Sequence, residues 1–382
     1  MQRRKLITLF GTSLLLWQTP LLAAAPSSID KPDNKSPSKK SNKKPSKKIV
    51  WIMLRGAMDS LHAVVPPIDD DLLKLRKELV EPIANTLQPL EKGFGLHPDL
   101  AFFHKLYKQK QLSPVVATAT PYRQRSHFDA QDFLESATTP TNHNNGWLAR
   151  TAQQYNGDAI AIAQSTPISL RGEIAARSWY PSSLPEAEDD LYNRLATMYE
   201  NDAELSNSLN QTLDTQNMVG DLATNKRPKL PELARACATL LKENNQLNFA
   251  MIEMGGWDTH NNQVRRLSVA FKELDAGLQI LHDQLGEAWQ DTLVIIATEF
   301  GRTAKINGTK GTDHGTASAL FFAGGSYQGG DVKGKWPGLA SNQLYQARDL
   351  MPTSNTFDWI NQSIQSHLNL TTTQMNQVFP TI

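Results

Sequence analysis

The stretch Leu247-Asn-Phe-Ala-Met-Ile-Glu-Met254 and the motif after it, Gly255-Gly-Trp-Asp-Thr-His260, indicate the kind of fold this chain adopts. An apolar run of this length is typical of a buried strand, and the two glycines free the backbone to turn. Asp258 and His260 then follow, separated by one residue. A carboxylate and an imidazole at the end of a core strand suit a divalent metal better than they suit packing. The alternative is that His260 caps a loop and that Asp258 or Asn261 starts the next helix.

Other apolar runs of strand length occur along the chain, with amphipathic helical patterns between several of them. In the clearest helical pattern, apolar residues recur three and four positions apart from Val264 to Leu285, which predicts a long helix covering one face of a sheet. Apolar strands that alternate with such helices predict a three-layer α/β fold, in which a mostly parallel sheet carries helices on both faces. The other predicted strands are Ile49–Leu54, Pro114–Thr118, Ala159–Ala163, Thr292–Thr298 and Ala319–Ala323.

Residues 49–382 are long enough to form one large α/β domain. Within this range, residues 180–245 differ from the rest because they are polar and mainly helical in pattern, with few strand signals. We therefore expect a helical excursion there, placed as a cap over the edge of the sheet.

The first 25 residues have the pattern of an export signal. Arg3-Arg-Lys5 precedes an apolar stretch that runs to Leu22, and Ala23-Ala-Ala25 follows. The paired arginines are typical of a twin-arginine signal, with an ordinary secretory signal as the alternative. A membrane anchor is disfavoured because the apolar stretch is short and interrupted. Residues 26–48 are rich in Lys, Ser and Pro and are predicted to be a disordered tether. We expect an exported protein of the periplasm or cell envelope, without a transmembrane span in the mature chain.

The nearly neutral charge of the chain, 39 Lys and Arg against 38 Asp and Glu, conceals an uneven distribution. Residues 1–48 contain eleven basic and two acidic residues, so the remainder carries 28 − 36 = −8. An acidic body argues against nucleic acid as the partner. Cys237 is the only cysteine, so no intrachain disulfide can form. A metal ion would therefore be bound by carboxylates and histidines.

Residues that can bind anions or metals follow the first two predicted strands, at the carboxyl ends where open parallel sheets bind their ligands. After Ile49–Leu54, Arg55 can hold an oxyanion and Asp59 can bind a metal, or the two can pair and close a loop. After Pro114–Thr118, Ser126 suits the N-cap of a helix. The same serine, flanked by Arg123, Arg125 and His127, is also placed to attack or to bind an anion.

The later strands show the same feature. Glu299 directly follows Thr292–Thr298, where a carboxylate must be paired, for example with Arg302, or bound to a metal. A glycine-flanked loop then carries Asp313 and His314 as another candidate ligand pair, just before Ala319–Ala323. Packing alone does not predict that Asp, Glu, His, Ser and Arg gather at one edge. A hydrolytic site with one or two metal ions does.

Six separate motifs stand out along the chain: Leu54-Arg-Gly-Ala-Met-Asp59, Phe94-Gly-Leu-His97-Pro, Arg125-Ser-His-Phe-Asp-Ala-Gln-Asp132, Gly255-Gly-Trp-Asp-Thr-His260, Thr298-Glu-Phe-Gly-Arg-Thr303 and Gly311-Thr-Asp-His-Gly315. In order and spacing, from about Ile49 to the C-terminus, they resemble the DUF1501 family of exported bacterial proteins. Through that family the chain resembles the alkaline-phosphatase and sulfatase superfamily, which implies the same α/β fold.

The resemblance implies a nucleophile and two metal positions. For the nucleophile it points to Ser126, and for the first metal to Asp258, His260 and His314. The second metal would take Asp59 and Glu299, with Phe300 standing where the superfamily has a histidine. Either Asp313 completes this second site, or the second ion is bound weakly or not at all.

The first functional hypothesis is an exported hydrolase of phosphate or sulfate esters that uses one or two divalent ions, Zn, Mn, Mg or Ca. Its substrate would be a small molecule or an envelope polymer, and Arg55, Arg125 or Arg302 would neutralise the ester oxygens. The second hypothesis is a non-catalytic, metal-binding exported protein of the same fold, which Phe300 favours. The third is a structural envelope protein retained by residues 26–48.

Overall fold

A computed structural model describes residues 46–181, 189–219 and 228–381 of the chain. The expected signal peptide, residues 1–25, and nearly all of the expected tether, residues 26–48, lie outside this range. The last residues of the expected tether are part of the domain, because β1 already begins at Lys48 and Lys47 contacts Asp291 at 2.8 Å.

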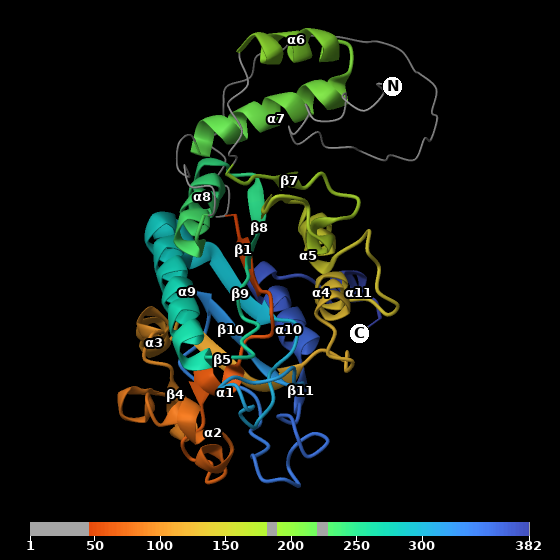
Figure 1. Ribbon diagram of the computed structural model, residues 1–382. Coiled ribbons are helices and arrows are strands. Elements are labelled where there is room, and N and C mark those ends of the chain that lie inside the picture. The colour runs from red at the N-terminus through yellow and green to blue at the C-terminus, as the bar shows by residue number, and fades with distance from the viewer. Residues whose placement is uncertain (1–45, 182–188, 220–227, 382) are drawn as a thin grey trace, which may run out of the picture.

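An eight-stranded sheet forms the centre of the molecule (Figure 1). Its strands pair in parallel except for β10, which is antiparallel to both of its neighbours, β5 and β9. The predicted mostly parallel sheet is therefore confirmed. The spatial order is β11 (Ser354–Asn355), β5 (Leu112–Ala119), β10 (Ser318–Gly324), β9 (Thr292–Thr298), β1 (Lys48–Leu54), β8 (Leu247–Met254), β6 (Asp158–Ile162) and β7 (Arg177–Ser178).

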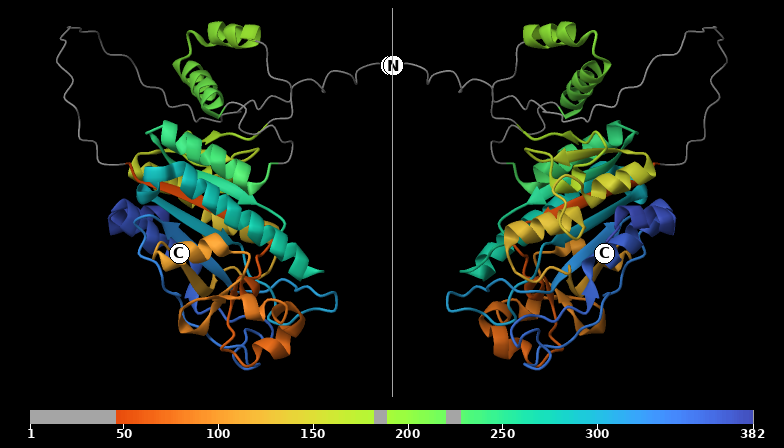
Figure 2. Two further views of the ribbon diagram at one scale, coloured as in Figure 1. Left: turned by 90° about the vertical axis from the view of Figure 1, so that its left-hand side faces the viewer. Right: turned by 90° about the vertical axis from the view of Figure 1, so that its right-hand side faces the viewer.

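Helices cover both faces of the sheet, as Figure 2 shows from the two sides. Along β1, Ile49, Trp51 and Met53 point into one apolar layer, and the residues between them point into the other. This alternation follows from the two-residue period of a strand. One layer contains α4 (His127–Ser136), α5 (Trp147–Tyr155), α10 (Thr356–Leu368) and α11 (Thr372–Val378), and the other contains α3 (Ala101–Lys108), α8 (Leu230–Glu243) and α9 (Gln263–Leu285). The three-layer prediction is confirmed.

The predicted long helix is α9. Its apolar stripe, which includes Leu267, Phe271, Leu274 and Leu278, is buried against the sheet and α8. The helix stops at Gly286, whose φ of +55° suits glycine better than other residues. Burial of a continuous stripe, more than helix propensity, fixes a helix of this length.

The direction of β10 places its preceding loop near the ends of the other strands. Leu54, Met254 and Thr298 lie opposite one another in register, so β1, β8 and β9 end together. Because β10 runs the other way, its first residue, Ser318, lies at this same edge. The loop that carries Asp313 and His314 therefore joins the residues that follow β1, β8 and β9.

Residues 180–245, predicted to be a helical excursion, contain three helices among the described residues. Helices α6 (Asp189–Tyr199) and α7 (Ala203–Val219) project from the end of the molecule opposite α1 and α2 (Figures 1 and 2), whereas α8 returns to cover the sheet. No helix among the described residues has the length and apolar character needed to cross a bilayer. The smaller elements are α1 (Ser60–Ala63), α2 (Leu72–Val80), β2 (Val64–Val65), β3 (Gln88–Pro89), β4 (Gly95–Leu96), η1 (Ala84–Thr86), η2 (Glu91–Gly93), η3 (Ile168–Leu170) and η4 (Gly286–Asp291).

Two buried histidines, His62 and His97, pack against each other beside α9. Their ring centroids are 5.0 Å apart, and both rings contact Phe271, at 6.3 and 4.7 Å. Within the described part of the chain, both ring nitrogens of His62 and Nε2 of His97 lack hydrogen-bond partners. Burial lowers the pKa of His62 to about 3 and that of His97 to about 4. Smaller charge effects come from Asp59 and Arg76 on His62, and from Asp99 and Lys272 on His97.

We predict that the protein loses stability as the pH falls from about 6.5 to about 4. Unfolded histidine has a pKa of about 6.5, so the unfolded chain binds protons that the folded chain excludes, at up to ~1.4 kcal/mol per histidine per pH unit. The stabilisation that comes from keeping these histidines neutral is complete above the histidine pKa of the unfolded chain. It is lost as the pH falls from that value toward the pKa values of the folded chain. Denaturant titrations at several pH values measure the slope of the unfolding free energy against pH. His62→Phe, which removes two unpartnered nitrogens, should flatten it. An unchanged slope in this variant would show that His62 is not its source.

Candidate metal centre

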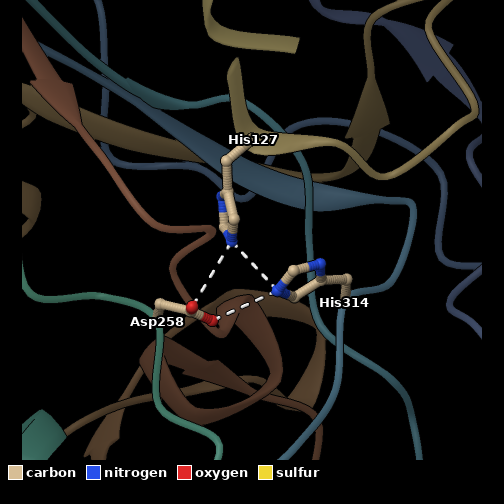
Figure 3. Close-up of side chains that lie close together, drawn as sticks. All are labelled: His127, Asp258 and His314. Carbon is tan, nitrogen blue, oxygen red and sulfur yellow. Dashed lines mark hydrogen bonds and ion pairs between the residues drawn. The ribbon is translucent and has the colours of Figure 1, made fainter. Parts of the chain in front are cut away.

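Three side chains from distant parts of the chain meet at the carboxyl edge of the sheet (Figure 3). His127 is the first residue of α4, Asp258 follows β8, and His314 precedes β10. His127 Nε2 lies 3.0 Å from His314 Nε2 and 3.5 Å from Asp258 Oδ2. His314 Nε2 lies 3.3 Å from Asp258 Oδ1. The two imidazole nitrogens and the carboxylate, which contacts each of them through a different oxygen, thus form a compact triangle.

His260 adds a fourth donor next to two members of this triangle. Its Nε2 lies 2.8 Å from Asp258 Oδ1 and 3.1 Å from His314 Nε2. The four side chains remain accessible, with 20 to 43% of each exposed. A small molecule can therefore reach the group from solvent.

In each of the three histidines, the other ring nitrogen, Nδ1, lies beside a hydrogen-bond acceptor. An acceptor at Nδ1 favours the tautomer that carries its proton there and leaves an unprotonated Nε2. The Nε2 lone pair of His314 then faces those of His127 and of His260, at 3.0 and 3.1 Å, an arrangement that a cation between them would stabilise. The acceptors are the Glu299 carboxylate for His127 (2.7 Å), the Asp313 carboxylate for His260 (3.2 Å) and the Arg125 carbonyl for His314 (3.1 Å).

The donor set fits a divalent transition metal. A tetrahedral ion with bonds of about 2.0–2.1 Å places its ligand atoms about 3.3 Å apart. The spacing in the triangle, 3.0 to 3.5 Å, matches that value. Imidazole nitrogens with one carboxylate suit zinc and its neighbours better than the oxygen-preferring magnesium or calcium.

Burial and charge tune the residues around the group. The hydrogen bond to Glu299 raises the pKa of His127, whereas burial lowers the pKa of His314. Burial alone would raise the pKa of Asp258, but the fully buried Arg302 guanidinium, 2.5 Å away, holds it below its usual value. Asp258 is therefore a carboxylate at neutral pH, the form that binds a metal.

Close backbone approach brings the ligand loops together. A Cβ on Gly56 would lie 2.6 Å from the Asp258 amide nitrogen, and one on Gly311 would overlap the His260 carbonyl. Any larger residue at these positions would push the loops apart. Arg125 has a left-handed φ of +59°, in the segment whose carbonyl oxygen faces His314. Such backbone strain is often found at functional sites.

Two of the expected ligands for a second metal ion are engaged elsewhere. Asp59 is buried and paired with Arg76, 3.0 Å from both carboxylate oxygens, and also accepts from Gln263 at 2.6 Å. It lies outside the triangle. Glu299 accepts hydrogen bonds from the Gly56 amide and Gln131, at 2.8 and 2.9 Å, besides contacting His127. In this structure the carboxylates of Asp59 and Glu299, the residues expected to hold a second ion, are therefore occupied by partners within the protein. Asp313 contacts His260 Nδ1 at 3.2 Å.

The three expected oxyanion-binding arginines are all paired with carboxylates. Arg55 contacts Glu135 and Glu253 at 2.6 and 2.7 Å. Arg125 contacts Asp349 at 2.7 Å, and Arg302 contacts Asp258 and the Thr312 carbonyl. The charges of these arginines, which were expected to neutralise ester oxygens, are therefore compensated within the protein. Arg302 instead fixes the Asp258 carboxylate.

Ser126 occupies the N-cap of α4, directly before His127. Its φ and ψ of −89° and 123° are extended, and its side chain makes no capping hydrogen bond. The serine is half-buried, and a hydrogen bond with it opposes the effect of burial on the pKa of Tyr122. The hydroxyl is therefore not used in holding the helix.

Sequence reasoning considered His127 only as a neighbour of Ser126 and missed it as a ligand. Its ring lies against Phe300, with centroids 4.9 Å apart, and reaches Glu299. The resemblance implied a histidine at the position of Phe300, after β9. The imidazole that lies beside this position comes instead from His127, on α4. The only sequence signal was its place at the start of a helix that follows a strand.

We predict that Glu299→Gln weakens metal binding about 10- to 100-fold without removing it. The carboxylate accepts from His127 and makes its Nε2 a better ligand, and loss of such a partner has this typical cost. Competition with a zinc chelator measures the affinity. Glu287→Gln, at an exposed position of η4, is the control. An effect as large as the loss of a ligand would mean that Glu299 binds the ion directly.

Comparison with known proteins identifies a family for the sequence. The model of DUF1501, described as a protein of unknown function, matches residues 112–358, which is more than half of the chain. None of the curated proteins matches the chain.

Several solved structures are similar in chain path. The C-terminal periplasmic domain of EcEptC from Escherichia coli, in complex with Zn, has a TM-score of 0.41 and 9% identity, with 76% of each chain covered. The alkaline phosphatase from the Antarctic bacterium TAB5 has a TM-score of 0.40 and 12% identity, covering 85% of this chain and 99% of that one. The lipoteichoic acid synthase LtaP from Listeria monocytogenes has a TM-score of 0.39 and 11% identity, covering 75% and 68%.

Proposed function

We propose that this chain, which belongs to the DUF1501 family, is an exported metal-dependent hydrolase of phosphate or sulfate esters. The observation that carries the proposal is the convergence of His127, Asp258 and His314 at 3.0 to 3.5 Å, with His260 beside them, at an accessible edge of the sheet. A structural metal site is normally closed and buried, whereas a catalytic site stays open to its substrate. The exposure of these side chains favours the second kind.

His127, Asp258, His260 and His314 would hold one divalent ion, with zinc as the best match to the donor set. When bound, such an ion supplies Lewis acidity at a phosphoryl or sulfuryl oxygen and lowers the pKa of a neighbouring hydroxyl. The chain's own contribution is to hold these donors rigidly. Arg302 fixes Asp258, and Glu299 fixes His127, through contacts of 2.5 and 2.7 Å.

Ser126 is the proposed nucleophile. It precedes His127, so the backbone that positions the ligand also positions the hydroxyl. The side chain makes no capping bond, so an approach to a substrate would exchange only its hydrogen bond with Tyr122. The free amides at the start of α4 favour the negative charge of a phosphate or sulfate group there. Attack by the Ser126 oxygen would form a serine ester while the bond from phosphorus or sulfur to the substrate's alcohol oxygen breaks, and the alcohol would leave with a proton that replaces the one lost by the serine. Water would then hydrolyse the serine ester, releasing phosphate or sulfate and restoring the hydroxyl.

Arg123 is the proposed partner of the non-bridging ester oxygens. Unlike Arg125 after it, Arg123 donates only to backbone carbonyls, those of Thr120 and Tyr122, among the described residues. Its positive charge is thus not compensated by a carboxylate. An uncompensated guanidinium three residues before Ser126 suits a planar, bidentate contact with an anionic ester.

A second function is favoured because the described part of the chain shows a single metal-binding group. Among the described residues, one cluster of histidine and acidic side chains has metal-binding spacing. Two-metal hydrolysis is therefore not supported, and a non-catalytic, metal-binding envelope protein would need only this one site. Such a protein would bind metal with the same residues but would leave Ser126 unmodified.

Turnover distinguishes the two functions. The purified chain is reconstituted with Zn²⁺ or Mn²⁺ and assayed on p-nitrophenyl phosphate, bis-p-nitrophenyl phosphate and p-nitrophenyl sulfate. The hydrolase predicts release of nitrophenol from at least one ester, abolished by chelation and restored by metal. No release from any ester by protein that demonstrably holds metal would favour the binding protein.

A further inference from the structure

A hollow lies near the amino-terminal end of β9, away from the metal centre at the carboxyl ends of the strands. Its volume is about 350 Å³, and its wall includes Leu293 near the start of β9. Glu299, which contacts His127, comes six residues later in the chain. At about 3.3 Å per residue, the two sites lie roughly 20 Å apart along β9. The size falls in the range of about 300–1,000 Å³ for small-molecule sites.

Aromatic rings form part of the lining. Trp359 of α10 and Tyr327 from the loop after β10 both line the hollow and are half-buried. The Trp359 indole already donates to the Ser354 hydroxyl at 2.9 Å, so its polar atom is satisfied within the protein. Tyr327 packs against Phe322 with ring centroids 5.8 Å apart. These contacts hold the rings in place.

Uncharged polar side chains complete the lining. Within the described residues, Gln362, Ser363, Ser366 and Asn369 line the hollow and make no side-chain hydrogen bond. Residues 359, 362, 363 and 366 recur at helical spacing, so they share one side of α10. Amide and hydroxyl groups each offer donors and acceptors. The wall therefore presents unused groups of both kinds beside aromatic surface.

The cations at the rim do not make the hollow an anion site. Lys47 is paired with Asp291 at 2.8 Å, and Lys333 with Asp331 at 3.0 Å. His367 also lines the hollow, and burial lowers its pKa to about 4, so it is neutral at physiological pH. A neutral ligand with many hydroxyl groups matches this wall better than a phosphate or a carboxylate does.

We propose that this hollow binds a neutral saccharide. The C–H face of a sugar ring would stack on the aromatic surface of Trp359, and its hydroxyls would exchange hydrogen bonds with Gln362, Ser366 and Asn369. The site is separate from the metal centre and would hold the protein on a glycan. The inference does not depend on the proposed hydrolysis.

Calorimetric titration of the purified full chain with maltotriose and with chitotriose tests this inference, with sodium sulfate as the anionic comparison. We expect one trisaccharide to bind and sulfate not to compete with it. Trp359→Ala removes the stacking surface, and Ser366→Trp fills the hollow from an exposed position. Each should weaken binding about tenfold or more, equivalent to about 1.4 kcal/mol.

Asn361→Ala is the matched control, because this residue lies on α10 next to Gln362 but not in the lining. It should leave the affinity unchanged, as should Asp258→Ala at the metal centre. The inference is overturned if neither trisaccharide binds, if sulfate displaces it, or if Trp359→Ala and Ser366→Trp, folded as judged by circular dichroism, bind as the parent does. Loss of binding in Asp258→Ala would overturn it as well, by moving the sugar to the metal centre.

Discussion

His127→Ala should lower the affinity for Zn²⁺ by about two to three orders of magnitude. A four-ligand zinc site has a binding free energy of about 10–16 kcal/mol, so one donor accounts for roughly a quarter of it. The variant also leaves the buried Glu299 carboxylate without its shortest hydrogen bond, 2.7 Å, which adds to the loss. Competition with a chromophoric chelator measures the affinity of variant and parent under identical conditions.

His143→Ala is the control for this prediction. His143 is exposed and pairs with Asp132 at 3.2 Å, away from the triangle. The His143→Ala variant should bind zinc with the same affinity as the parent. His314→Ala should reproduce the effect of His127→Ala, because the two Nε2 atoms face the same point. Equal affinity for Zn²⁺ in the parent, His127→Ala and His314→Ala would contradict the proposed metal centre.

Ser126→Ala should lower turnover about 10⁴-fold or more, the scale on which removal of a nucleophile acts. The proposed reaction passes through a covalent ester on this serine, and alanine cannot form it. Metal affinity should be retained, because the variant keeps His127 and the other donors. Steady-state rates on the responsive nitrophenyl ester, and mass spectrometry after an acid quench, measure turnover and the modified serine.

Ser268→Ala, on a half-exposed position of α9, is the matched serine control and should keep full turnover. Unchanged turnover in Ser126→Ala would exclude this residue as the nucleophile even if the metal centre is real. A rate lost together with metal affinity would instead indicate that the substitution disturbs α4 and its first residue, His127.

The sheet is predictable from sequence because its strands are continuous apolar runs. Leu247–Met254 matches the observed strand exactly in extent, and the others agree to within two residues. The gathering of Asp258, His260 and His314 also follows from strand ends. What sequence alone does not reveal is the reversed direction of β10, which brings His314 to this edge from the start of a strand.

The role of individual charges is not predictable in the same way. Asp59, Arg55 and Arg302 have the residue types that a phosphate or metal site needs, but each finds its partner among residues far away in sequence. Arg76 lies in α2, and Glu135 in α4. Only the folded chain decides which charges are compensated in the interior, because a buried charge must be paired wherever a partner is available.

The most direct measurement is the metal content of the chain purified without added metal. Elemental analysis should find one equivalent of a divalent transition metal, with zinc as the best match, and the His127→Ala and His314→Ala variants should lose it. One equivalent is expected because the described residues form a single group with suitable spacing. Absence of bound metal in the parent, persisting after incubation with Zn²⁺ and Mn²⁺, would contradict the metal centre on which the proposed hydrolysis rests.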